Sequence, residues 1–84
     1  MDKFILSLSC PDQAGIVAAV SSTLAENRLN IYDSQQFGDG ESGRFFMRIG
    51  FEGAVSLAEA QSLMSPVAAR FDMDWSLFDA RHRP

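Results

Sequence analysis

The chain has 84 residues, a formal net charge of −4 and 46% hydrophobic residues, which describes one small globular domain without room for a second. The acidic balance argues against nucleic acid as a partner, and no apolar run reaches the roughly 18 residues of a membrane span. The start lacks a secretory signal pattern and the lone cysteine, Cys10, excludes an internal disulfide, so we expect a cytoplasmic protein.

The first predicted element is a strand that leads directly into a helix. Phe4, Leu6 and Leu8 alternate with other residues as in a strand with one apolar face. The strand pattern stops at Cys10, and the loop from Pro11 to Gly15 opens a helix at once. Free first-turn amides and the helix dipole favour an anion at such a junction, but every helix start needs a cap, and Asp12 as an ordinary cap is the simpler alternative.

The following helix and strand differ sharply in polarity. Apolar residues at helical spacing begin at Ile16, and Asn27 is the expected left-handed stop because asparagine tolerates positive φ. Residues 30–37 are strand-like but polar in the middle, which favours an edge of the sheet. Residues 38–43, with three glycines, predict a turn that joins this strand to the next as a hairpin.

The second half repeats the order of strand and helix. Residues 44–52 alternate most clearly, with Phe45, Met47, Ile49 and Phe51 on one face. Ser56 and Glu59 form a capping box that begins a helix over 57–71, in which Pro66 should cause a kink or a restart. Residues 73–78 alternate again as a last strand, and residues 79–84 are polar and unpatterned.

The order β-α-β-β-α-β predicts an α+β, ferredoxin-like two-layer sandwich. Its four-stranded antiparallel sheet carries both helices on one face, with the first and third strands central. The open sheet face then holds Ile5, Ser7, Ser9 and Phe46, with Arg48 beside them. Such a face is a candidate contact surface, although a few exposed apolar residues are also normal.

No catalytic or metal-binding set is visible in the sequence. The single histidine, His82, lies in the polar tail, and Cys10 has no partner base, so it is expected to be a buried filler rather than a nucleophile. We expect no metal and no cofactor, since ligands at metal-binding spacing are missing. The segment 44–51 loosely resembles an RNA-recognition motif, but only Phe46 is expected to point outward.

Two sets of residues carry a resemblance to a known family. The strand, the C-P-D-x-x-G-I-V segment at 10–17 and the predicted topology resemble the ACT domain, a small regulatory module. The segments D-S-Q-Q-F at 33–37 and G-R-F-F-M-R at 43–48 resemble the N-terminal domain of the formyltetrahydrofolate deformylase family. The resemblance implies a regulatory ACT domain at 1–80, with 81–84 as a tail or the start of a linker to a catalytic domain.

The resemblance also implies a function and a site. Complete members of that family hydrolyse 10-formyltetrahydrofolate to formate and tetrahydrofolate, in one-carbon metabolism and purine synthesis, through a formyltransferase-like domain whose catalytic residues have no counterpart here. ACT domains form homodimers or higher homo-oligomers and bind small amino acids, here of the glycine or methionine class, where the first loop meets a partner's strand and helix. This implicates a set of six residues: Asp12, Gln13, Ala14, Gly15, Asn30 and Ile31.

We therefore expect the turn that ends at Gly15 to lie beside the beginning of the 30–37 strand, of the same chain or of a neighbouring subunit. The alternatives are a free-standing ACT regulator that binds amino acids and a purely structural dimerisation module.

Overall fold

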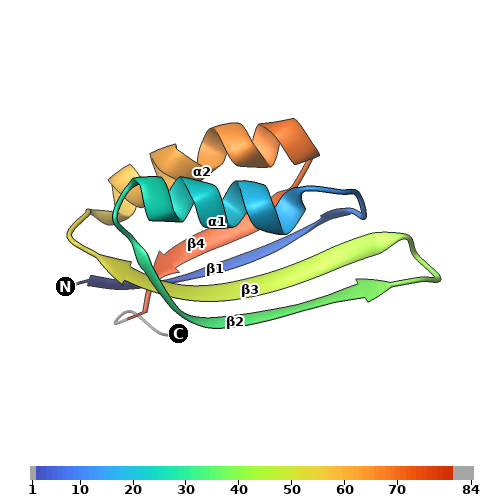
Figure 1. The fold of residues 1–84 in the computed structure, drawn as a ribbon, viewed down its shortest axis with the longest axis horizontal. Coiled ribbons are helices and arrows are strands. Elements are labelled where there is room, and N and C mark those ends of the chain that lie inside the picture. Colours follow the sequence, from blue (N-terminus) through green and yellow to red (C-terminus); the bar gives the residue numbers. More distant parts are fainter. Residues whose placement is uncertain (1, 81–84) are drawn as a thin grey trace.

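The computed structural model describes residues 2–80 and confirms the predicted order of elements. The tail at 81–84, which includes His82, lies outside the described residues, as does the boundary predicted there. Three strands and two helices precede a last, shorter strand (Figure 1): β1 (Asp2–Pro11), α1 (Ile16–Glu26), β2 (Asn30–Asp39), β3 (Arg44–Gly53), α2 (Leu57–Phe71) and β4 (Asp74–Asp79).

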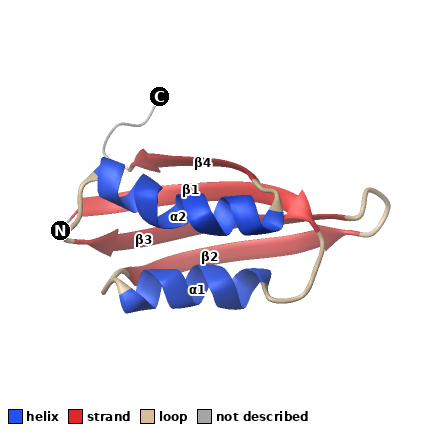
Figure 2. Ribbon diagram, turned by 90° about the horizontal axis from the view of Figure 1, so that it is seen from above, coloured by secondary structure: helices blue, strands red, loops and turns tan. Residues whose placement is uncertain are grey.

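The four strands form one antiparallel sheet in the order β2-β3-β1-β4. The two most apolar strands, β1 and β3, are central and the polar β2 is an edge, as predicted. Both helices cover the same face of the sheet (Figures 1 and 2). In Figure 2, α2 lies over β1 with β4 beside it, whereas α1 lies along the β2 side.

The core lies between the helices and the covered face of the sheet. Alternate residues of β1 and β3 point into it because successive side chains of a strand face opposite sides. They meet one apolar stripe from each helix, and the buried cluster includes Phe4, Leu6, Leu8, Cys10, Ile16, Val20, Leu24, Met47, Ile49, Phe51, Ala60, Met64 and Phe71.

The helices correct the prediction for Asn27 and one of the two alternatives predicted for Pro66. Asn27 does not adopt the left-handed conformation; Arg28 does, with φ 59°, while the Asn27 side chain donates to the Thr23 carbonyl at 2.7 Å. The helix α2 continues from Leu57 to Phe71 through Pro66, so it does not restart there, which was one of the two predicted effects of this proline. Pro66 and Ser62 are both exposed, so the Ser62 carbonyl that loses its partner lies on the solvent side of the helix.

A bulge in β2 decides which of its side chains face the core. Ile31 pairs with Phe51 and Asp33 with Gly50, so Tyr32 is the extra residue. Since one inserted residue reverses the alternation, Phe37 lies opposite Phe46 on the open face of the sheet.

Candidate functional site

The predicted loop is fastened to the β2–β3 turn. The strand β1 continues to Pro11, one residue beyond the predicted end, and pairs there with Arg44. The Asp12 amide then donates to the Gly43 carbonyl at 2.9 Å. This bond fixes the position of the loop at the turn end of the sheet.

The Asp12 carboxylate lies against β2 and does not cap the helix. A Cβ added to Gly38 would stand 3.3 Å from Asp12 Oδ2, so the carboxylate rests almost on the backbone of that glycine. The cap position belongs to Gly15, and no side chain bonds to the helix start from it. The interpretation of Asp12 as an ordinary cap is therefore wrong.

Gln13 holds the loop to the second helix. Its Nε2 donates to the Pro11 carbonyl at 3.1 Å and to the Phe71 carbonyl at 3.3 Å. The second bond satisfies a carbonyl at the end of α2, where the last helical carbonyls lack partners within the helix. Gln13 therefore has a structural role that the sequence did not indicate.

Gly15 opens the helix α1 in a conformation that suits glycine. Its φ is 90°, in the left-handed region, and its carbonyl accepts the first helical bond, from the Ala19 amide at 2.9 Å. Ala14 and Gly15 are exposed. The amides of the first turn thus begin beside a residue without a side chain, at the positive end of the helix dipole, where an anionic group is favoured.

Asn30 and Ile31 lie at the opposite end of the sheet from this loop. Asn30 pairs with Glu52 and Ile31 with Phe51, whereas Asp39, at the opposite end of β2, pairs with Arg44 beside the loop. Asn30 and Asp39 are nine positions apart, which is about 30 Å along an extended strand. One chain therefore does not bring the six predicted residues together: Asp12 to Gly15 form one group, and Asn30 and Ile31 form another.

Cys10 behaves as a core residue. It is fully buried, and burial raises the pKa of its thiol above the ordinary value of 9.0, with smaller effects from Arg44, Asp12 and Asp72. A thiol that stays protonated is a poor nucleophile.

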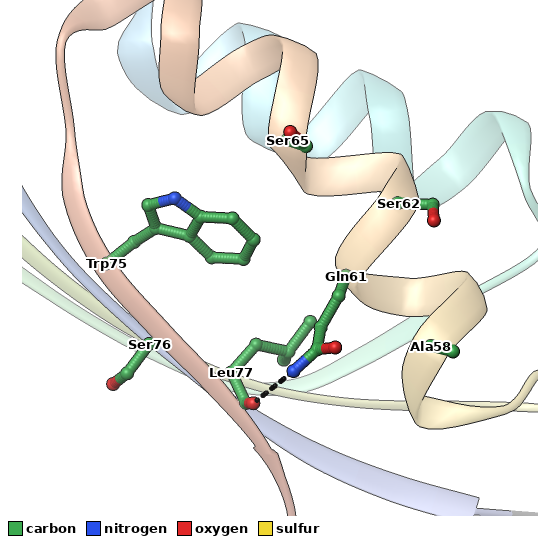
Figure 3. Close-up of a pocket in the computed structure, with 7 residues that line it drawn as sticks. All are labelled: Ala58, Gln61, Ser62, Ser65, Trp75, Ser76 and Leu77. Carbon is green, nitrogen blue, oxygen red and sulfur yellow. Dashed lines mark hydrogen bonds between the residues drawn. The ribbon is translucent and has the colours of Figure 1, made fainter.

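A hollow that contains none of the predicted site residues lies between α2 and β4 (Figure 3). It has a volume of about 770 Å³. Gln61 Nε2 donates to the Leu77 carbonyl at 3.3 Å across it, and the ring of Trp75 points from β4 toward α2. None of its lining residues carries a charge: Ala58, Gln61, Ser62, Ser65, Trp75, Ser76 and Leu77. The small residues on this side of α2 were the only sign of it in the sequence.

The open sheet face carries more aromatic surface than the sequence indicated. Phe46 points outward as predicted, and the bulge adds Phe37, which is 64% exposed and stacks on Phe46 with ring centroids 5.1 Å apart. Ile5, by contrast, is only 8% exposed, because its neighbours Gly50 and Phe78 flank it and the Tyr32 ring covers Gly50. The sequence analysis did not identify Phe37 as part of this face. Which side of the sheet its side chain occupies depends on the bulge at Tyr32, which no local pattern indicates.

Comparison with known proteins agrees with this architecture. Residues 4–61 match the ACT domain family. The formyltetrahydrofolate deformylase of Bacillus subtilis (strain 168) is 49% identical over 80 residues, which cover 90% of this chain and 27% of that protein. The crystal structure of formyltetrahydrofolate deformylase from Burkholderia mallei has a TM-score of 0.92 and 36% identity, covering 100% of this chain and 30% of that chain. An ACT domain protein from Streptococcus pneumoniae has a TM-score of 0.81 and 25% identity, covering 94% of this chain and 90% of that one.

The βαββαβ sandwich and the family match define a small regulatory domain, and the chain belongs to the ACT domain family. Its ACT domain is of the kind found in formyltetrahydrofolate deformylase-like proteins, which confirms the resemblance predicted from D-S-Q-Q-F and G-R-F-F-M-R. The chain spans little more than a quarter of the length of the curated deformylases that it matches. Within residues 2–80, neither helix is long and apolar enough to cross a bilayer.

Proposed function

We propose that this ACT domain senses a small amino acid for a formyltetrahydrofolate deformylase, an enzyme that hydrolyses 10-formyltetrahydrofolate to formate and tetrahydrofolate. The similarity to deformylases supports this assignment, and a formyltransferase-like domain in the full-length protein would carry the reaction. The function belongs in the cytoplasm, where a thiol such as Cys10 stays reduced. In this role the domain feeds a regulatory signal into one-carbon metabolism and purine synthesis.

The observation that carries the proposal is the separation of the two groups of site residues along β2. The edge strand β2 is ten residues long, and its outer side is unpaired by any strand of the described chain. Two copies that pair antiparallel through β2 would set Asn30 of one copy level with Asp39 of the other. Asp12, which rests on Gly38, would then lie close to Asn30 of the second copy.

Such a contact has the right chemistry for an amino acid of the glycine or methionine class. The ligand carboxylate would accept from the first-turn amides of α1 at Gly15. Its ammonium group would be held by the Asp12 carboxylate of one copy and the Asn30 side-chain carbonyl of the other. Each two-fold dimer would contain two such sites.

A mixing experiment tests whether the site is shared between copies. We expect calorimetric titration with glycine, methionine and serine to show binding for the wild-type chain, and none for Asp12→Ala or Asn30→Ala alone. An equimolar mixture of the two variants should recover about one quarter of the wild-type sites, since half of the dimers are mixed and each of these keeps one intact site. Gln36→Ala, an exposed change on the same strand, is the control and should bind as the wild type does.

Other outcomes would favour the alternatives. Dimers that give no heat and no thermal shift at millimolar amino acid would leave only a structural dimerisation module. A monomer in light scattering at high concentration would remove the shared site altogether. A gene that ends after residue 84 would favour a free-standing regulator, the arrangement suggested by the Streptococcus pneumoniae ACT domain protein, of which this chain covers 90%.

A further inference from the structure

The open face of the sheet holds an exposed aromatic platform. Phe37 and Phe46 lie opposite each other on β2 and β3, and their rings stack with an interplanar angle of 20°. Phe37 remains 64% exposed although it is stacked, so one face of its ring is available to solvent. An exposed aromatic face favours a second planar ring through offset stacking.

A free cation lies beside this platform. Arg48 follows Phe46 by two residues on the same face, and its neighbours across the sheet are Ser7 on β1 and Gln35 on β2. Arg48 is exposed and forms no ion pair or hydrogen bond with any residue between Asp2 and Ala80. Around it, β1, β2 and β3 form a shallow cavity of about 220 Å³.

The two sides of Phe46 differ in charge. On the far side, Arg44 donates to Ser9 Oγ at 3.0 Å and pairs with Asp74 at 3.3 Å, so its charge is already compensated. The Asp74 carboxylate there would repel an anion. Arg48, which forms no ion pair within residues 2–80, is therefore the cation beside Phe46 that can pair with an added anion.

We propose that this cavity binds a small planar aromatic carboxylate. The aromatic ring stacks on Phe37 and the carboxylate forms a bidentate pair with the Arg48 guanidinium. The Gln35 amide and the Ser7 hydroxyl supply further donors at its rim. The site lies on the sheet face away from the helices, so it is separate from the amino-acid site proposed above. A negative result for one site would not contradict the other.

Nuclear magnetic resonance titration of the ¹⁵N-labelled chain with three matched probes tests the proposal. We expect 2-naphthoate to give saturable shifts at the amides of residues 35–37 and 46–48. Decahydro-2-naphthoate, which keeps the charge but not the planar ring, and 2-naphthamide, which keeps the ring but not the charge, should each bind at least about tenfold more weakly. Shifts without saturation, or equal affinity for all three probes, would overturn the proposal.

Four variants assign the binding to the named residues. Arg48→Met should weaken 2-naphthoate by about tenfold or more, whereas Arg70→Met, on the exposed side of α2, should leave its affinity unchanged. Phe37→Trp should bind at least as well as the wild type, and Phe37→Leu, which keeps apolar area but not the planar ring, should lose binding. Equal losses of affinity in Arg48→Met and Arg70→Met would show that only the net charge of the chain matters. Self-association that buries Phe37 and excludes 2-naphthoate would show that this face is a protein contact. Either result contradicts the proposal.

Discussion

The ring of Tyr32 covers Gly50 so closely that a Cβ on this glycine would lie 2.8 Å from Cε1 and Cζ of the tyrosine. The contact lies on the open face, where the bulge at Tyr32 meets the central strand β3. The Lys3 ammonium stands 5.4 Å from the centre of the same ring. The edge strand β2 is thus held to the sheet by a side chain as well as by backbone pairing.

Adding a methyl group at Gly50 should separate these two residues. Gly50→Ala is expected to reduce the free energy of unfolding by about 1–3 kcal/mol, because the Cβ and the Tyr32 ring would occupy the same space. Urea denaturation measures the loss. In a chain that already carries Tyr32→Ala, Gly50→Ala should cost little, since the ring is then absent. A double variant in which the two losses simply add would show that the ring is not the obstacle.

The Gln13 side chain should contribute to stability through its bond to the end of α2. Gln13→Ala is expected to cost about 1 kcal/mol in the free energy of unfolding, as the part-buried Phe71 carbonyl loses a donor. The exposed Gln36 forms no side-chain bond in the described chain, so Gln36→Ala is the matched control and should change stability little. Equal losses for the two glutamines would contradict this role.

The capping box at the start of α2 should contribute to the stability of the domain independently of Gln13. Ser56 Oγ accepts from the Glu59 amide and Glu59 Oε1 accepts from the Ser56 amide, both at 3.1 Å. Ser56→Ala should reduce stability by about 1 kcal/mol in thermal or urea unfolding. Ser65→Ala, inside the same helix, should be neutral or slightly stabilising because alanine is the better helix former.

Cys10 should make stability depend on pH in the alkaline range. Folding raises the pKa of its thiol because the side chain is buried, so the unfolded chain loses this proton at a lower pH than the folded chain. The stabilisation linked to the thiol is therefore complete below pH 9.0 and is lost as the pH rises toward the pKa of the folded state. The free energy of unfolding should fall by at most about 1.4 kcal/mol for each pH unit in that range.

The control for this dependence is Cys10→Ala. The variant should be less stable at neutral pH, because a buried side chain is shortened, but the part of the alkaline slope that belongs to the thiol should vanish. Identical slopes of the free energy of unfolding against pH for the wild type and the variant, above pH 9.0, would show that the thiol does not carry the effect.

Local patterns in the sequence were sufficient for the secondary structure and for most of the core. Alternation in β1 and β3 predicted both central strands, and the pair Ser56 and Glu59 predicted the start of α2. These signals are local, since a side chain's face in a regular strand or helix follows from its distance to its neighbours along the chain. The polar middle of β2 likewise predicted its place at the edge.

Only part of the candidate site could be predicted from the sequence. The loop from Asp12 to Gly15 was identified from the residues, but the role of Gln13 depends on Phe71, which is 58 positions away. The distance between Asp12 and Asn30 depends on the registers of three strands. No pattern in the residues near the loop indicates either relationship.

The amino-acid sequence by itself determined the order of the elements, the two apolar central strands, the capping box and the glycine at the start of α1. Only the tertiary structure decided that Phe37 stands on the open face and that Asp12 lies far from Asn30 in one chain. The physical reason is the same in both cases. Alternation is a property of neighbouring residues, whereas a bulge and a register arise from pairing with a distant strand, and one extra residue at Tyr32 reverses every side chain that follows it in β2.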